Sequence, residues 1–424
     1  MPDHRPEIRL GEYESTELGT DQLTTADVTR LHALQARRCL SLTTSRTGWR
    51  LKAEAAVGVL ALDRVRLVVE PKFAIRGEQL MTWLAYALHT PVPTTARRWV
   101  ARTDGYTDLV AAALLEECEK LLREGLRRDY VRRQSLEPVL RGRLDVAAQA
   151  TRRYGQLDQL HVRTFDREAE IWDNRVLGVA LQAALSLTTD SRLARALHGI
   201  TDAFPHSGTP AAALRALERT QYTRLNARYR PAHTWARLLL RGGGVTDLLT
   251  DDGTTAGGFL LAMPMLWEAV VRRLAAEAAA PRGGLPVPGH GETGITVRGD
   301  LGNASTFRPD LLLSFPRPAP DGPVLLPVDA KYKRYDRHRV SAGDIHQLLT
   351  YSAGYTPADA PSAVIIHPQP GGYDRRTLRV MSPQGSLGVL HVLGIDTQAL
   401  PEDATAWLRS SLPRASACVR ASNA

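Results

Sequence analysis

Short runs of alternating apolar and polar residues dominate the first 73 residues. Such alternation is typical of half-buried β-strands, whereas apolar spacings of three and four residues are typical of amphipathic helices. Only residues 25–38 have the helical spacing, with Thr24 or Thr25 as the N-cap. The junction Asp63-Arg64 predicts a tight hairpin, and Pro71 ends the last strand. The predicted strands cover residues 8–13, 39–44, 49–53, 57–62 and 65–69.

From about residue 78 to residue 241 the pattern becomes helical. Long apolar periods predict helices at residues 106–128 and 169–187. Between these periods, residues 123–153 contain nine arginines interspersed with acidic residues. A solvated surface of ion pairs is the simpler interpretation of this stretch, and a DNA-binding groove is the alternative. The glycines and polar residues between 242 and 258 mark a boundary.

After Phe259 the predicted order is a helix, three strands, a second helix and a strand. Pro264 fits the first turn of the first helix, which continues to about residue 280. Ser341, with Asp344 three residues later, is typical of a helix start, and Gly354 is expected to end that helix. The predicted strands cover residues 295–298, 310–315, 324–331 and 363–367, and the last is apolar enough to be buried in a sheet.

These patterns predict an α+β protein of several domains. We expect a β-rich module at residues 1–77, a helical middle region at 78–250, an α/β domain at 251–400 and a C-terminal tail at 401–424. A hydrophobic fraction of 43% and a charged fraction of 23% are typical of globular proteins. The sequence shows neither an apolar run of roughly 20 residues nor a signal-peptide core, and its three cysteines form no CxxC pair. A cytoplasmic protein without disulfides is therefore expected.

The chain is basic, with a formal charge of +9 and a sequence pI of about 9.7. Lysines and arginines displace counterions from phosphates, so this charge is compatible with nucleic-acid binding. Most of the excess is arginine, which a GC-rich genome also produces. The charge alone therefore leaves the partner open.

Three residues in the C-terminal part suggest hydrolytic chemistry. Asp310 opens one predicted strand, and Asp329 and Lys331 close the next. If these strands are antiparallel, both aspartates meet at one end of the sheet, and Asp329 and Lys331 point to the same face. Carboxylates suit Mg²⁺, which offsets negative charge at a phosphate and lowers the pKa of an attacking water, and a lysine can stabilise the transition state. We therefore predict a Mg²⁺ site, with Mn²⁺ as the alternative, held by Asp310 and Asp329 for phosphodiester hydrolysis.

Two helices contribute further candidates. Gln347 and Tyr351 are one turn apart on the polar face of the helix that begins at residue 341, from which they can reach the strand ends. An ordinary solvated face is the alternative, and their place after the Asp-x-Lys strand favours the site. Glu268 lies off the apolar stripe of the preceding helix, so it is either a further acid of the site or a solvated residue.

Other nucleotide motifs are excluded by their context. Residues 289–294 match GxGxxG, but a glycine- and proline-rich linker precedes them and a predicted strand follows. A dinucleotide-binding loop needs the opposite order, with a strand before and a helix after. There is no GxxxxGK[ST] sequence, so we do not expect this chain to hydrolyse nucleoside triphosphates itself.

Segments along most of the chain resemble the McrC family, the nuclease subunits of McrBC-type restriction systems. Near the start, the similar segments are Leu10-Gly11-Glu12-Tyr13-Glu14, Val57-Gly58-Val59 and Val69-Glu70-Pro71-Lys72-Phe73. In the middle they are Leu140-Arg141-Gly142-Arg143-Leu144-Asp145 and Asp173-Asn174-Arg175-Val176-Leu177. Towards the end they are Leu266-Trp267-Glu268, Arg308-Pro309-Asp310, Asp329-Ala330-Lys331-Tyr332-Lys333 and residues 344–351.

The resemblance implies a PD-(D/E)xK nuclease domain and a partner. McrC-like proteins act with McrB, an AAA+ GTPase that binds the GTP and recognises and moves double-stranded DNA modified with 5-methylcytosine. The resemblance implies that residues 1–77 dock on this partner and that the chain stimulates its GTP hydrolysis. It also implies that Asp310 and Asp329 bind Mg²⁺ while Lys331 positions the nucleophile. The connection between Asp310 and Asp329 is longer and richer in proline than the family pattern.

Two other functions remain open from the sequence. The chain is either the nuclease of such a system, a non-cleaving activator or adaptor of the AAA+ motor, or a stand-alone repair nuclease similar to RecB-like domains. The presence of Asp310, Asp329 and Lys331 together argues against a purely structural role. The roughly 250 residues before the nuclease domain argue against a stand-alone enzyme.

Overall fold

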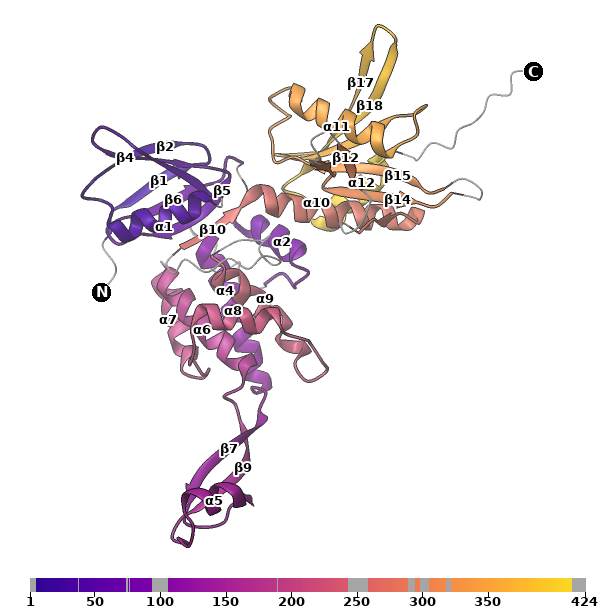
Figure 1. Cartoon of the computed structure of the whole chain (residues 1–424). Coiled ribbons are helices and arrows are strands. Elements are labelled where there is room, and N and C mark those ends of the chain that lie inside the picture. The colour runs from indigo at the N-terminus through magenta and orange to yellow at the C-terminus, as the bar shows by residue number, and fades with distance from the viewer. Residues whose placement is uncertain are drawn as a thin grey trace. The chain divides into compact units, whose positions relative to one another are not determined.

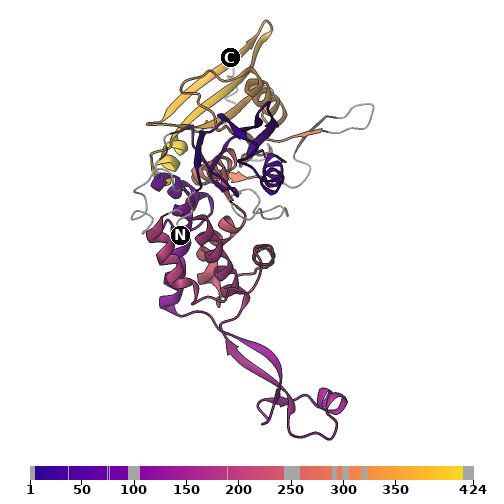
Figure 2. The ribbon, with the colours of Figure 1, turned by 90° about the vertical axis from the view of Figure 1, so that its left-hand side faces the viewer.

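The computed structural model describes residues 5–36, 38–73, 75, 77–93, 106–188, 190–242, 258–288, 294–297, 305–317 and 322–413. Figures 1 and 2 show its ribbon from two sides. The chain forms two compact units, each of which combines segments far apart in the sequence. Unit 1 contains Met1–Ile8, Gly58–Val68 and Pro93–Leu260, and unit 2 contains Arg9–Val57, Val69–Val92 and Leu261–Ala424. No helix among the described residues is long and apolar enough to cross a membrane.

The N-terminal segment is rich in short strands, as the alternation predicts. Thr24 caps the single long helix before residue 73, because its hydroxyl accepts a hydrogen bond from the Asp27 amide at 3.2 Å. Leu62 donates to the Val65 carbonyl at 3.0 Å, which confirms the hairpin at Asp63-Arg64. The sheet orders are β2-β4-β3 and β1-β6-β5-β10. The elements are β1 (Glu7–Gly11), β2 (Ser15–Gly19), α1 (Thr25–Ala36), β3 (Leu40–Thr44), β4 (Gly48–Ala53), β5 (Ala56–Ala61), β6 (Arg66–Glu70), α2 (Gly77–Ala87) and β10 (Gly258–Ala262).

The middle region is helical at both ends but contains a small sheet that the sequence did not predict. Charged residues on both faces of its two long strands hide the alternation that marks a strand. These strands pair antiparallel from Asp129↔Glu168 to Glu137↔Leu160, with the sheet order β7-β9-β8. The elements are α4 (Tyr106–Glu124), β7 (Asp129–Glu137), β8 (Arg143–Leu144), α5 (Val146–Arg152), β9 (Leu160–Glu168), α6 (Trp172–Leu187), α7 (Ser191–Thr201), α8 (Pro210–Glu218), η1 (Ala227–Tyr229) and α9 (Arg230–Leu240).

We call residues 129–168 the β7–β9 arm, because both views show β7 and β9 extending beyond the helices of their unit (Figures 1 and 2). Gly142 has a φ of +82°, and a Cβ there would lie 2.5 Å from the Arg163 carbonyl oxygen, so the turn requires glycine. Asp145 caps α5 and pairs with Arg163 at 2.5 Å. The arm's ion pairs favour the interpretation of its arginines as a salt-bridged surface.

A buried polar network at the base of the arm joins it to the helices. The Asp173 carboxylate is fully buried and pairs with Arg127 at 2.5 Å. Asn226 donates to the same carboxylate at 3.2 Å. Asn174 donates to the Arg127 carbonyl at 2.9 Å and accepts from the Tyr229 hydroxyl at 2.8 Å. Asp173 and Asn174 belong to a segment that resembles the family. Their contacts therefore fix the chain between the end of α4 and the start of β7.

Burial lowers the pKa of His233, at the edge of this network, to about 4. Its Nε2 lies 3.0 Å from the Asp173 carbonyl, which can only accept, so Nε2 carries the proton and Nδ1 accepts from Tyr222 at 3.1 Å. Unfolded histidine titrates near pH 6.5. Between pH 6.5 and 4 the unfolded chain therefore binds a proton that the folded chain does not. As the pH decreases through this window, the free energy of unfolding should fall by about 1.4 kcal/mol per pH unit.

Urea unfolding of the whole chain between pH 7 and 4.5 measures this dependence. His233→Gln should flatten it, and the matched change His198→Gln, at an exposed position of α7, should leave it unchanged. An equal slope for the wild type and for His233→Gln would rule out His233 as its source.

The C-terminal part is built on a six-stranded sheet with the order β11-β14-β15-β16-β18-β17. The central pairs β15–β16 and β16–β18 are parallel, and the pairs β14–β15 and β17–β18 are antiparallel. The elements are α10 (Met263–Ala279), η3 (Ala280–Arg282), β11 (Leu285–Pro286), β12 (Ile295–Val297), β13 (Ser305–Phe307), β14 (Leu311–Phe315), β15 (Val324–Ala330), α11 (Ala342–Tyr355), β16 (Ser362–Gln369), β17 (Asp374–Ser382), β18 (Gly385–Asp396) and α12 (Pro401–Ser411).

Helices cover this sheet on both sides. α11 packs Leu348 and Tyr351 against Ala363 and Ile365 of β16, and Figure 1 shows α10 and α12 on the other side. The buried run in β16 confirms the predicted core strand. The segment expected as a tail begins with α12, whose Ala404 and Leu408 are fully buried, and residues 414–424 lie outside the described residues.

Among the predicted boundaries that differ from the structure, two concern β15 and α11. β15 ends at Ala330, although the Lys331 amide still donates to the Ile366 carbonyl at 2.9 Å. Gly354 does not end α11, which continues to Tyr355 with Thr356 as its C-cap. A Cβ on Gly354 would lie 2.3 Å from Cδ1 of Ile295 in β12. The glycine therefore allows β12 to approach the helix closely instead of terminating it.

Candidate active site

The predicted aspartates meet at one end of the β14–β15 pair. Leu311 lies opposite Val328 in the antiparallel register, so Asp310 and Asp329, the next residues along, face each other just beyond. The Ala330 amide donates to Oδ2 of Asp310 at 2.7 Å, which fixes the Asp310 carboxylate against the end of β15. The connection rich in proline therefore does not disturb the pairing that brings the two carboxylates together.

A continuous line of contacts joins β15 to α11. Lys331 Nζ lies 2.7 Å from Oδ2 of Asp329 and donates to Oε1 of Gln347 at 2.9 Å. The Gln347 amide donates to the Tyr351 hydroxyl at 2.9 Å, and that hydroxyl donates to the Arg308 carbonyl at 2.6 Å. Because Tyr351 is buried and Gln347 half-buried, their side of α11 faces the strand ends. The alternative of an ordinary solvated face is wrong.

Glu268 lies on α10 within electrostatic reach of this line. Burial raises its pKa, and the nearby Asp310 charge raises it further. Its carboxylate is paired with Arg272 at 2.6 Å, one helical turn further on. The neighbouring Trp267 donates to the Ile366 carbonyl at 3.1 Å, which attaches α10 to β16 beside the site. Glu268 is therefore adjacent to the site but is engaged by an arginine.

Charge crowding defines the electrostatics of the site. Asp329 is 1% exposed at its side chain, and burial, followed by the Asp310 charge, raises its pKa to about 6. The pKa of Lys331 is also raised, since the Asp329 carboxylate outweighs the opposing effect of burial. The site contains two adjacent carboxylates but one ammonium group. Its charges therefore have a net attraction for a cation.

The site has the donors that a magnesium ion requires. Oδ1 of Asp329 is buried and accepts no hydrogen bond from the described residues. An unpaired buried carboxylate oxygen beside a second carboxylate is suited to a hard cation. Within the described ranges no group of three or more His, Cys, Asp and Glu side chains has metal-binding geometry. A Mg²⁺ ion here would have the Asp310 and Asp329 carboxylates as ligands and water for the rest of its shell, as Mg²⁺ commonly does.

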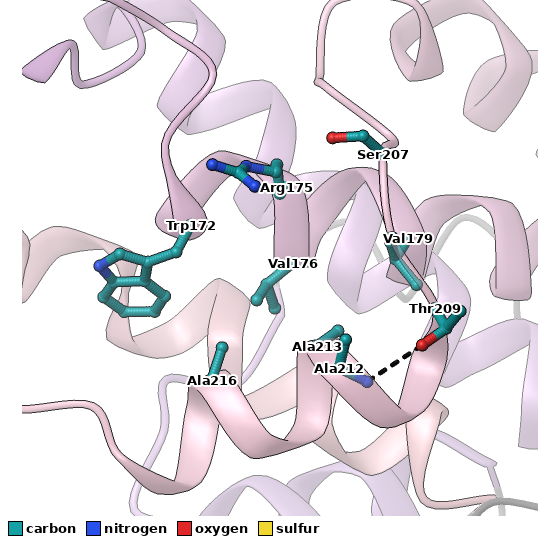
Figure 3. Close-up of a pocket in the computed structure, with 10 residues that line it drawn as sticks. Trp172, Arg175, Val176, Val179, Ser207, Thr209, Ala212, Ala213 and Ala216 are labelled. Carbon is teal, nitrogen blue, oxygen red and sulfur yellow. Dashed lines mark hydrogen bonds between the residues drawn. The ribbon is translucent and has the colours of Figure 1, made fainter. Parts of the chain in front are cut away.

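A groove of about 160 Å³ between α6 and α8 is a different kind of feature (Figure 3). Its walls are mostly small and apolar, with Trp172 and Arg175 at one side and the N-terminus of α8 at Thr209. None of its lining residues is acidic. Its lining therefore differs from the paired carboxylates of the candidate site.

Sequence reasoning missed the backbone acceptors of the site. The Arg308 carbonyl fixes Tyr351, and the Ile366 carbonyl accepts from both Lys331 and Trp267. Main-chain groups leave no residue signature, so no motif could reveal them. Glu12 and Lys72 lay inside segments that resemble the family, but nothing in the sequence placed them near Lys331.

The fold and the site define a mixed α/β protein with an acidic, lysine-containing site at the end of a central strand. A family model described as McrBC 5-methylcytosine restriction system component matches residues 51–368. The chain belongs to this family. No curated protein matches it.

One solved structure resembles nearly the whole chain, and a second resembles part of it. The chain is similar to one in a refined half-complex from a tetradecameric assembly of Thermococcus gammatolerans McrB AAA+ hexamers with bound McrC. That match has 18% identity and a TM-score of 0.67, and it covers 96% of this chain and 100% of the other. A second match, from the Thermococcus gammatolerans McrBC complex, has 20% identity and a TM-score of 0.47, and it covers 64% of this chain and 88% of the other. The first match shows a similar fold over 96% of this chain.

Proposed function

We propose that this chain is the Mg²⁺-dependent DNA-cleaving subunit of a McrBC-type restriction system and that its C-terminal domain is a PD-(D/E)xK nuclease. The observation that carries the proposal is the line of contacts from Asp329 through Lys331 and Gln347 to Tyr351, with Asp310 fixed beside it. All these groups come from the strand ends and the following helix that the motif requires.

The roles of the residues follow from their chemistry. Asp310 and Asp329 would hold Mg²⁺, which when bound offsets charge at the scissile phosphate and lowers the pKa of an attacking water. Lys331 is held between Asp329 and Gln347, so its ammonium group is oriented in advance and can stabilise the developing negative charge. Tyr351 keeps Gln347 in place through the Arg308 carbonyl. Glu268 adds negative charge beside Asp310.

We further propose that the chain acts with an AAA+ GTPase of the McrB type, which binds the GTP and selects methylated DNA, and that the chain stimulates its GTP hydrolysis. The family match and the structural similarity to a chain from a McrB–McrC assembly support this pairing.

One assay separates the three functions that the sequence left open. The purified chain would be combined with the AAA+ GTPase of the same genome, GTP and Mg²⁺, on methylated and unmethylated DNA. Cleavage that needs every component supports the proposal. Cleavage by the chain alone would make it a stand-alone nuclease. Stimulated GTP hydrolysis without any cleavage would make it an activator.

The β7–β9 arm is the surface that we propose for the AAA+ partner. Eight of the 17 large hydrophobic side chains that are exposed among the described residues lie on it, and such concentrations mark protein interfaces. They are Tyr130, Leu136, Val139, Leu140, Val146, Tyr154, Leu157 and Phe165. The resemblance implied docking through residues 1–77, but the described part of that segment exposes only Tyr13 among its large hydrophobic side chains.

Tyr154→Ser combined with Leu157→Ser should weaken binding to the partner at least about tenfold and reduce GTPase stimulation, because exposed aromatic and apolar anchors often dominate interfaces. These side chains are 88% and 78% exposed, so the melting temperature should not change. Leu225→Ser, at a 70% exposed position outside the arm, is the matched control. Full stimulation by the double variant would place the interface elsewhere.

A further inference from the structure

A buried cluster from the N-terminal strands surrounds Tyr332, the residue directly after Lys331. Glu12 lies in the turn after β1, and Lys72 lies just after β6. The Glu12 amide donates to the Glu70 carbonyl at 3.0 Å, and Oε2 of Glu12 accepts from the Lys72 amide at 2.7 Å. Hydrogen bonds therefore join these two turns to each other independently of Tyr332.

Both the hydroxyl and the backbone carbonyl of Tyr332 are hydrogen-bonded to this cluster. Its hydroxyl donates to Oε2 of Glu12 at 3.1 Å, and its carbonyl accepts from Nζ of Lys72 at 2.9 Å. Between these ends, the Tyr332 ring packs edge-on against the buried Phe73 ring, with centroids 5.0 Å apart. Neither the ring nor the peptide of Tyr332 can turn without breaking one of these contacts.

The Lys72 ammonium group is itself in contact with aromatic rings. Its ammonium group lies 4.2 Å from the centroid of the Tyr332 ring and 4.9 Å from that of Tyr13, both within the range of cation–π attraction. Burial lowers the pKa of Lys72, whereas the charge of Glu12 opposes that shift. The aromatic rings therefore replace part of the water that a lysine normally keeps.

Packing alone does not account for this cluster. Glu12 is 6% exposed, and its Oε1 has no hydrogen-bond partner among the described residues. Burial raises the pKa of its carboxyl, and a buried polar atom without a partner has a desolvation cost that no hydrogen bond offsets. An apolar side chain of similar size would avoid this cost. A costly polar contact next to a reactive group is typical of a functional constraint.

The position of Lys331 in the chain explains how contacts at Tyr332 can orient it. Its amide makes the last bond to β16 at the end of β15, so the sheet fixes only the N-terminal side of the residue. On the C-terminal side, the Lys331 carbonyl accepts from the Lys333 amide at 2.9 Å, and the contacts of Tyr332 fix the residue between them. The ammonium group must nevertheless meet both Asp329 and Gln347 at hydrogen-bonding distance.

We infer that Glu12 and Lys72 are positioning residues for Lys331, because their hydrogen bonds to Tyr332 fix the backbone next to it. The inference rests on the proposed nuclease function. The N-terminal strands thereby become part of the cleavage machinery, although they carry none of the nuclease motif. A displacement of about 1 Å at a reacting group can cost roughly 10²-fold in rate.

The test uses Lys72→Met and Glu12→Gln in the full chain with the AAA+ partner, GTP, Mg²⁺ and methylated DNA. Methionine keeps the apolar stem among the rings, and glutamine keeps the shape of Glu12, so both variants should fold. The kcat for DNA cleavage should fall by about 10- to 100-fold, as for other residues that orient a reactive group. The KM for DNA and the stimulation of GTP hydrolysis should not change, because the inference concerns only Lys331.

Further variants separate positioning from stability. Lys72→Arg restores a cation that stacks on aromatic rings and donates to a carbonyl, so it should recover kcat relative to Lys72→Met. Glu12→Gln and Tyr332→Phe weaken the same contact, so their combined effect on kcat should be smaller than the product of the two. Lys52→Met is the matched control, because Lys52 lies on β4 and pairs with Glu54 instead.

The outcomes are distinguishable. A wild-type chain that fails to cleave in the complete system overturns the proposed function and this inference with it. A cleaving wild type with Lys72→Met and Glu12→Gln variants at the same kcat overturns the inference alone. Losses of kcat that only follow a lower melting temperature, without recovery by Lys72→Arg, show a structural role and overturn it as well.

Discussion

Asp329→Asn should abolish Mg²⁺-dependent DNA cleavage, with a fall in kcat of at least about 10²- to 10³-fold. The substitution keeps the size of the side chain but removes the charge that would hold Mg²⁺ and the partner that fixes Lys331 at 2.7 Å. Oδ1 of Asp329 accepts no hydrogen bond from the described residues, so in the wild type it is available to the ion. Single-turnover cleavage of methylated DNA with the AAA+ partner measures the effect.

Two controls make this result specific to the site. Asp403→Asn changes the same chemical group at an exposed position in the first turn of α12 and should leave cleavage unchanged. The Asp329→Asn protein should also still stimulate GTP hydrolysis, since the β7–β9 arm is intact. In addition, Mg²⁺ should raise the melting temperature of the wild type but not that of the variant. Full cleavage by Asp329→Asn would remove the proposed metal site.

Asp173→Ala should have the largest effect on stability, about 3–5 kcal/mol, because it removes the buried partner of Arg127 and leaves that arginine with only the half-exposed Asp129. Its carboxylate is fully buried and binds both Arg127 and Asn226. Chemical denaturation monitored by circular dichroism would measure the loss. The variant should also lose GTPase stimulation if the arm binds the partner, since Arg127 lies where the arm leaves α4.

The matched comparison for this change is Asp190→Ala. Asp190 is the N-cap of α7 in the same unit, and its side chain accepts from the amides of Arg192 and Leu193. Loss of such a cap costs about 1 kcal/mol. Equal destabilisation by the two substitutions would show that the buried network contributes no more than a surface cap.

The sequence anticipated which residues meet at the candidate site better than it anticipated their surroundings. Alternation on β15 placed Asp329 and Lys331 on one face, and the helical period placed Gln347 beside Tyr351; the contacts between these four residues agree with both. These are local relations, fixed by the strand and helix repeats over a few residues. The metal and the catalytic roles stay predictions.

Non-local features escaped the sequence. The sequence pattern places the β7–β9 arm in a helical region, because its exposed strands bury little and therefore show no apolar alternation. It also predicts Gly354 as a helix end, whereas the role of this glycine depends on the approach of Ile295. The motif containing Asp173 and Asn174 was noticed, but its partners Arg127 and Tyr229 lie roughly 50 residues away along the chain.

The sequence is enough to predict the family, the α+β class and the residues of the candidate site. The meeting of Asp310 with Asp329, and the contacts of Glu12 and Lys72 with Tyr332 across about 320 and 260 residues of chain, become visible only in the folded chain. Periodicity records which face of an element is buried, whereas the partner that a buried polar group finds depends on how distant elements pack together.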